Sequence, residues 1–123
     1  MIGAILGDII GSPYEFDRGN KSKEFPLFSR ESTYTDDTVM TLAVSLTFLD
    51  AQPSASDDWI LQNLANRMRQ FGKMYPNAGY GGMFRQWLRN PECKAYNSFG
   101  NGSAMRVSSV AWLYNDIDAV RHA

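Results

Sequence analysis

The 123-residue chain has little of what several common classes of functional site require. It has one cysteine, Cys93, so no intramolecular disulfide can form. Cys93 follows Pro91 in a polar stretch and is interpreted as a structural or incidental thiol rather than a nucleophile. The one histidine, His122, is the penultimate residue and is not expected to serve an ordered site. A disulfide scaffold is therefore excluded, and neither residue is expected to carry chemistry.

The sequence also lacks a concentration of charge and a long apolar run. Twelve Lys and Arg residues oppose 13 Asp and Glu residues, for a formal net charge of −1, and no basic cluster occurs. Nucleic acid is not an expected partner, because non-specific binding needs a concentrated positive face. Residues 1–11 are apolar but too short to span a membrane, and Gly7-Asp8 interrupts them without a basic region before them. No membrane association is predicted, and the cytoplasm is the expected location.

Helical periodicity is what the sequence does contain. Hydrophobic residues make up 44% of the chain and aromatic residues 13%, which is typical of a packed globular domain. No internal repeat, low-complexity tract or extended β alternation is present. The predicted fold class is therefore all-α, with about five helices in one domain over residues 1–123.

The first predicted helix carries two different faces. Apolar residues recur at helical spacing and predict a buried stripe: Ile2, Ile5, Leu6, Ile9 and Ile10. Gly3, Gly7 and Gly11 fall four residues apart on a second face. Because glycine weakens a helix, we expect another helix or a ligand to approach closely there.

Further helices follow a polar segment. Residues 17–34 are predicted to form a loop long enough to line a site or act as a lid. Residues 36–49 predict a helix that is apolar on nearly every side and therefore buried. A third helix should begin after an N-cap at Ser56, with an inward stripe of Ile60, Leu64, Met68 and Phe71. Short helices are predicted over residues 83–89, with Phe84, Trp87 and Leu88 inward, over residues 104–113, and from about residue 115.

The stretch from Thr35 to Thr38 is the first candidate for a site. Asp36 and Asp37 are adjacent carboxylates at the start of the second predicted helix. One interpretation is that they are first-turn acids that complement the helix dipole. The other is that two carboxylates at the mouth of a buried helix are neutralised by a divalent cation, since their burial is otherwise costly.

Two glycine loops before helices are further candidates. Residues 79–82 and residues 98–103 expose backbone N–H groups that could bind a phosphate. Each is also a common turn sequence. Together with the acid pair they suit a phosphorylated or dinucleotide-like substrate handled by Mg²⁺ or Mn²⁺, which prefer oxygen ligands.

Four ordered motifs resemble the ADP-ribosylglycohydrolase family. They are Gly7-Asp8-Ile9-Ile10-Gly11 with Glu15 beyond it, Tyr34-Thr35-Asp36-Asp37-Thr38, Gly79-Tyr80-Gly81, and Ser98-Phe99-Gly100-Asn101-Gly102-Ser103-Ala104-Met105-Arg106. The resemblance covers the whole chain. It implies a compact all-α domain that hydrolyses the bond between ADP-ribose and a protein side chain or another ADP-ribose, using two Mg²⁺ or Mn²⁺ ions.

The resemblance also implies roles for individual residues. Thr35, Asp36 and Asp37 would be metal ligands, and either aspartate could take a proton from the attacking water. Glu15 would be a mobile acid near the metals, suited to gating or proton transfer. Cleavage at the ribose passes through an oxocarbenium-like state, in which the ions mainly orient the reactants. The residues implied to contact the substrate are Gly79, Tyr80 and Gly81 at the diphosphate, and Ser98, Phe99, Gly100, Asn101 and Gly102 along the ADP-ribose, with Phe99 near the distal ribose or diphosphate.

The chain departs from the family in one motif. The family's carboxy-terminal half carries Asp-x-Asp followed by Thr or Ser, which completes the two-metal site. Here Asp116-Ile117-Asp118 is followed by Ala119 and comes too soon after the second glycine loop, so it is interpreted as helix-start acids.

Three hypotheses remain on this evidence. The first is the amino-terminal part of a metal-dependent hydrolase, with little activity unless another chain supplies the missing carboxylates. The second is a non-catalytic relative that binds ADP-ribose or serves structurally, like the crystallin-like members of the family. The third is a metal-dependent phosphohydrolase of an unrelated helical family. The expected partners are ADP-ribose or an ADP-ribosylated protein, together with self-association or a complementary chain that covers unpacked apolar helix faces.

Overall fold

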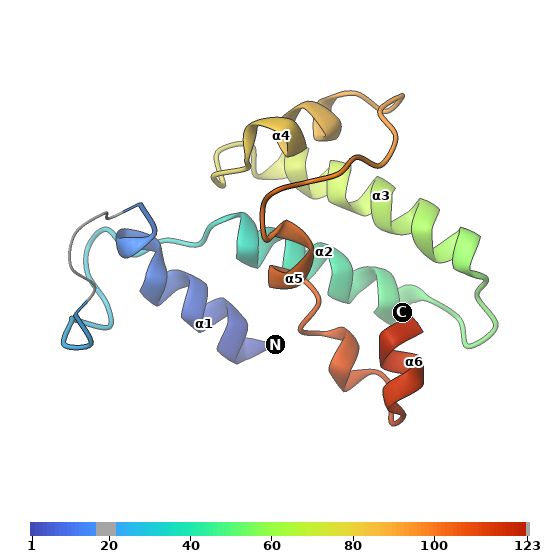
Figure 1. Cartoon of the computed structure of the whole chain (residues 1–123), viewed down its shortest axis with the longest axis horizontal. Helices are drawn as coiled ribbons and strands as arrows, with labels where there is room; N and C mark the ends of the chain where they lie inside the picture. The colour runs from blue at the N-terminus through green and yellow to red at the C-terminus, as the bar shows by residue number, and fades with distance from the viewer. Residues whose placement is uncertain (17–21, 123) are drawn as a thin grey trace.

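The structure is a computed structural model that describes residues 1–16 and 22–122. All regular secondary structure in these ranges is helical (Figure 1). The elements in chain order are α1 (Ile2–Gly11), η1 (Ser12–Tyr14), α2 (Asp36–Asp50), α3 (Asp57–Met74), α4 (Gly82–Arg89), α5 (Gly102–Met105), η2 (Val110–Trp112) and α6 (Ile117–His122). The all-α prediction is confirmed. Of the loop predicted over residues 17–34, residues 17–21 lie outside the described ranges.

Helix α2 is the central element, and α1, α3 and α5 all pack against it. It begins at Asp36 because the extended residue Thr35 caps it, with the Thr35 hydroxyl accepting from the Asp37 N–H at 3.3 Å. The predicted burial of this helix is confirmed, since Met40, Thr41 and Thr47 are each no more than 2% exposed. Burial of one large apolar side chain stabilises the fold by about 1.5–3 kcal/mol, so α2 contributes a large part of the packing energy.

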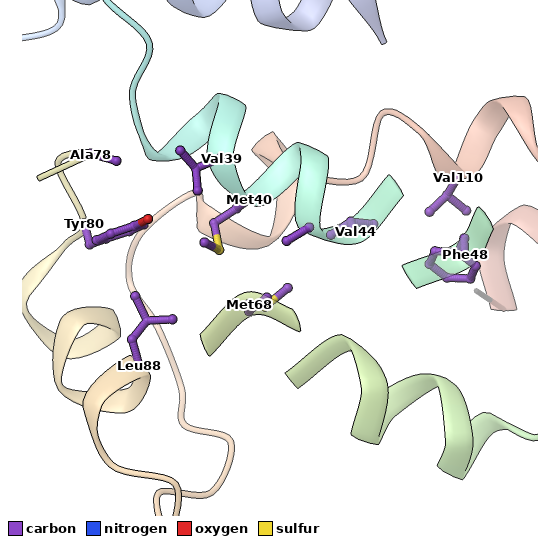
Figure 2. Close-up of a cluster of buried hydrophobic side chains, with 10 residues drawn as sticks. Val39, Met40, Val44, Phe48, Met68, Ala78, Tyr80, Leu88 and Val110 are labelled. Carbon is purple, nitrogen blue, oxygen red and sulfur yellow. The ribbon is translucent and has the colours of Figure 1, made fainter. Parts of the chain in front are cut away.

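The core forms where α3, the loop before α4, α4 and η2 meet α2 (Figure 2). Its buried members are Val39, Met40, Ala43, Val44 and Phe48 of α2, with Met68, Ala78, Tyr80, Leu88 and Val110. Two hydroxyls inside this core are satisfied within α2: Ser45 Oγ donates to Thr41 O at 2.6 Å, and Thr47 Oγ1 donates to Ala43 O at 2.9 Å. Buried polar groups are therefore tolerated along α2 without cost to the packing.

Helices α3 and α4 form as predicted. Ser56 caps α3, its Oγ accepting from the Trp59 N–H at 3.3 Å. The predicted inward stripe of α3 faces the core, with Met68 buried and Ile60, Leu64 and Phe71 partly buried. In α4, Leu88 is buried and Phe84 and Trp87 are partly buried against the same core.

The predicted burial of α1 is wrong for the described residues. Ile2 is 74% exposed and Leu6 is 44% exposed, while Ile5, Ile9 and Ile10 are only half-buried. The glycine face is also open: a Cβ built at Gly3, Gly7 or Gly11 meets nothing within 4 Å. No second helix approaches these glycines in the part of the chain that the structure describes.

The helix predicted over residues 104–113 is also wrong, because α5 ends at Met105. Residues 106–109 leave the helix, and the rest of the predicted range holds the short η2. Val107, Ser108 and Ser109 are poor helix formers, and the break turns Ser109 and Val110 into the core. Tertiary packing therefore takes precedence over the apolar periodicity that suggested one helix.

We predict that Met40→Ala lowers the free energy of unfolding by about 2–5 kcal/mol, because it leaves a cavity at a fully buried position. Leu49→Ala, at a 64% exposed position of the same helix, should change it by less than about 0.5 kcal/mol. Urea denaturation followed by circular dichroism measures both. Equal losses in the two variants would contradict the central position of α2.

Candidate active site

A pocket of about 800 Å³ opens at the amino-terminal end of α2. Its walls come from α1, from the start of α2, from the loop before α4 and from the segment that leads into α5. Figure 1 shows how far apart in the sequence these segments are and how the chain returns them to one end of α2.

Nearly all of the residues predicted for a site meet in this pocket. Those that line it are Glu15, Thr35, Asp36, Asp37, Gly79, Gly81, Ser98, Phe99, Gly100, Asn101 and Gly102. The exception is Tyr80, whose side chain is 3% exposed and lies among the core residues (Figure 2). The Tyr80 ring is therefore not placed to contact a ligand in the pocket. The acid pair and both glycine loops form one concave surface.

Asp8 is a residue of the pocket that sequence reasoning did not assign a role. Its Oδ1 accepts from Thr35 Oγ1 at 2.6 Å, and its Oδ2 accepts from the Thr35 N–H at 2.8 Å. The same Oδ2 accepts from the Thr38 N–H at 3.2 Å and from Thr38 Oγ1 at 2.6 Å. Asp8 thus connects α1 to the first turn of α2. The available signal was a single charge inside the apolar run of residues 1–11.

The carboxylates of the pocket repel one another. Burial raises the pKa of Asp36 to about 6, and the charges of Asp37, Glu15 and Asp8 add to this effect. Burial also raises the pKa of Asp37, with a further rise from Asp8. For Glu15 the causes of a raised pKa are burial, then Asp37, then Asp8. Negative charge is therefore concentrated here beyond what the nearby side chains neutralise.

Arg106 is the second residue that sequence reasoning left without a role. It lines the pocket, and its guanidinium lies 4.8 Å from the centroid of the Phe84 ring. Its Nε donates to Gly102 O, and its Nη1 lies 3.5 Å from the Met68 sulfur. Burial lowers the pKa of Arg106, while Tyr96 and the acid pair raise it. In turn, the charge of Arg106 lowers the pKa of Asp37.

Glycine is needed for different reasons in the two loops, residues 79–82 and residues 98–103. A Cβ at Gly102 would lie 2.6 Å from Arg106 Nη2, so the bare backbone at this position makes room for the guanidinium. Gly79 has φ +95°, which other residues rarely adopt. A Cβ at Gly81 or Gly82 would meet nothing within 4 Å, so these two glycines border open space. The backbone before α4 is thus left accessible to a ligand.

The pocket offers part of a ligand set for a hard divalent cation. Thr35, Asp36 and Asp37 offer hydroxyl and carboxylate oxygens, which Mg²⁺ and Mn²⁺ prefer. Beyond the effect of burial, neighbouring carboxylates add to the raised pKa values of Asp36 and Asp37, and a cation beside them would relieve that repulsion. However, no group of three or more His, Cys, Asp or Glu side chains within residues 1–16 and 22–122 is arranged to hold a metal ion. These residues therefore fit one side of a metal site.

The family assignment follows from the fold, the pocket and a comparison with known families. Residues 1–123 match the ADP-ribosylglycohydrolase family model. The chain belongs to this family. Among curated proteins it is similar to ADP-ribosylhydrolase ARH3 of Mus musculus, with 29% identity over 98% of this chain and 39% of the relative. ADP-ribosylhydrolase ARH3 of Homo sapiens gives 29% identity over 98% of this chain and 40% of the relative.

The same protein from Xenopus tropicalis is 30% identical over all of this chain and 41% of its own length. The chain thus spans about 40% of the length of the curated relatives it matches. No solved structure matches it. Among the helices of the described ranges, none has the length and apolar content that a membrane crossing requires.

We predict that Asp36→Asn stabilises the metal-free protein at pH 7. The pKa of Asp36 is about 6 when folded against 3.8 ordinarily, so ionisation disfavours folding; the penalty is absent below pH 3.8 and complete above pH 6. One pKa unit corresponds to about 1.4 kcal/mol, and discounting for solvent screening leaves a gain of about 1 kcal/mol at pH 7 and none at pH 3.5. Urea denaturation in EDTA at both pH values measures it.

Asp58→Asn is the matched control, because Asp58 is an exposed first-turn acid of α3. Its effect should stay within about 0.5 kcal/mol at both pH values. An Asp36→Asn variant that is less stable than the wild type at pH 7 would contradict the unfavourable burial and repulsion of the Asp36 charge.

Proposed function

We propose that the chain provides the ADP-ribose pocket and one side of the metal site of a hydrolase. The reaction is cleavage of the glycosidic bond that links ADP-ribose to a protein side chain or to a related ADP-ribosyl conjugate. The observation that carries the proposal is the meeting of the acid pair and both glycine loops in one pocket of about 800 Å³. Family membership and the names of the curated relatives support the same reaction.

In this proposal Thr35, Asp36 and Asp37 hold Mg²⁺ or Mn²⁺. When bound, the cation supplies positive charge that orients the ribose hydroxyls and favours ionisation of the attacking water. Asp36 or Asp37 accepts the proton of that water through a carboxylate oxygen. Glu15 lies at the end of η1, is exposed at the pocket wall, and serves as the mobile acid that gates the site or transfers a proton.

The remaining walls bind the two parts of ADP-ribose. The backbone at Gly79 and Gly81 receives the diphosphate, which the open space beside Gly81 supports. Residues 98–102 line the ADP-ribose, and the Phe99 ring is fully exposed and therefore free to pack on a ribose. The Tyr80 side chain packs in the core and so holds the loop of residues 79–82 in place.

A second candidate function is binding of ADP-ribose without hydrolysis. The observation that favours it is that no group of three or more His, Cys, Asp or Glu side chains within the described residues is arranged to hold a metal ion. A binding protein needs the pocket but not a complete metal site, so the same walls would serve it.

The exposed apolar side chains support self-association or a complementary chain as a partner. Ile2, Phe16, Trp112 and Ile117 are each more than 60% exposed. Apolar surface of this kind is typically covered by a protein partner. We propose that such a partner also supplies the carboxylates that complete the metal site. A cytoplasmic location stays a prediction from the sequence.

Calorimetry with ADP-ribose tests the pocket independently of turnover. We predict that the purified chain binds ADP-ribose and that Mg²⁺ strengthens this binding, because the cation neutralises the repelling carboxylates. Asp37→Ala should abolish the effect of Mg²⁺, whereas Asp58→Ala, at the first turn of α3, should retain it. Failure of the wild-type chain to bind ADP-ribose with or without Mg²⁺ would contradict the proposal.

Release of ADP-ribose from an ADP-ribosylated protein distinguishes the two candidates. We predict slow release by the purified chain alone, because no group of three or more His, Cys, Asp or Glu side chains in its described residues is arranged to hold a metal ion. Release at an ordinary enzymatic rate of about 1 per second or more, abolished by Asp36→Ala, would instead mean that the chain completes the site itself. Binding without any release, even with a complementary chain added, would favour the non-catalytic alternative.

A further inference from the structure

The Thr35 hydroxyl has a defined orientation at the pocket wall. Its Oγ1 donates to Asp8 Oδ1 at 2.6 Å and accepts from the Asp37 N–H at 3.3 Å. A hydroxyl has one hydrogen and two lone pairs, so one lone pair is left for a further partner. Thr35 therefore presents an acceptor to the pocket, and not a hydrogen that would repel a cation.

The orientation depends on Asp8, which is itself held firmly. Both of its oxygens are engaged, by the Thr35 hydroxyl on one side and by Thr35 and Thr38 donors on the other. A carboxylate with four donors around it has little freedom to turn toward a cation. Asp8 thus acts on Thr35 from behind the pocket wall.

We propose that Asp8 is a positioning residue for the metal site. By accepting the hydroxyl hydrogen of Thr35, it makes the Thr35 oxygen a fixed acceptor for a divalent cation. This inference rests on the proposed function, which places the cation at Thr35, Asp36 and Asp37. Partners that orient a ligating side chain in this way typically change metal affinity by about 10–100-fold when they are removed.

Thr38 separates this role from simple stabilisation of the fold. Its buried hydroxyl also donates to Asp8, at 2.6 Å, and Val is of nearly the same shape. Thr38→Val therefore removes one of the bonds between α1 and α2 but leaves the Thr35 hydroxyl on Asp8. A purely structural role of Asp8 predicts similar behaviour of Thr38→Val and Asp8→Asn.

The experiment is a Mn²⁺ titration of the whole chain, followed by the electron paramagnetic resonance signal of free Mn²⁺. Wild type, Asp8→Asn and Thr38→Val are compared at a temperature where circular dichroism shows each to be fully folded. We expect Asp8→Asn to bind Mn²⁺ about 10-fold or more weakly, since the Asn side chain cannot accept from all four donors. Thr38→Val should lose less than about 3-fold, because it alters only a bond that does not involve Thr35.

The outcomes separate the inference from the proposed function. Unchanged affinity in Asp8→Asn, or equal losses in the two variants, would overturn the positioning role and leave the metal site standing. Absence of Mn²⁺ binding by wild type would overturn the metal site and this role of Asp8 together.

A measurement on the wild type covers the case in which Asp8→Asn fails to fold. The Thr35 amide donates to Asp8 at 2.8 Å, so its proton resonance reports whether that bond persists. We expect the resonance to keep its hydrogen-bonded position as Mg²⁺ saturates the chain. Loss of that position with Mg²⁺ would show that Asp8 leaves Thr35 to ligate the metal itself, and would overturn the inference.

Discussion

The hydrogen bonds between the Asp8 carboxylate and the first turn of α2 are the interaction on which the site depends. They join two helices that are far apart in the sequence, and they do so at the point where α2 presents its acid pair. Charge-assisted hydrogen bonds of this kind are stronger than neutral ones. Without them α1 would be held less firmly against α2, and with it the wall that α1 contributes to the pocket.

Burial of α2 imposes the second constraint. A helix packed on several sides leaves its amino-terminal end with few directions in which to face solvent, so Asp36 and Asp37 are drawn partly out of water. The dipole of α2 favours negative charge at this end, but mutual repulsion raises the pKa of both groups. The packing around α2 therefore stabilises the fold and, at the same time, creates the need for a positive charge beside Asp36 and Asp37.

Features of the fold could be predicted from the sequence where they depend on interactions between residues close together in the chain. The start of α2 at Asp36, the cap at Ser56 and the burial of α2 follow from local sequence patterns, and all three predictions are confirmed. The role of Asp8 depends on donors 27 to 30 residues away, which no local pattern encodes. The core position of Tyr80 likewise depends on packing against α2, which its glycine-rich neighbourhood does not suggest.

The contact between Gly102 and the Arg106 guanidinium has a consequence for how sequences of this family can change. The two positions share one volume, because any side chain at 102 would enter the space that the guanidinium fills. A side chain at position 102 would therefore displace the far end of the flexible Arg106 side chain from its place over the Phe84 ring. Glycine at position 102 is thus what leaves the Arg106 guanidinium undisturbed between the pocket wall and the Phe84 ring.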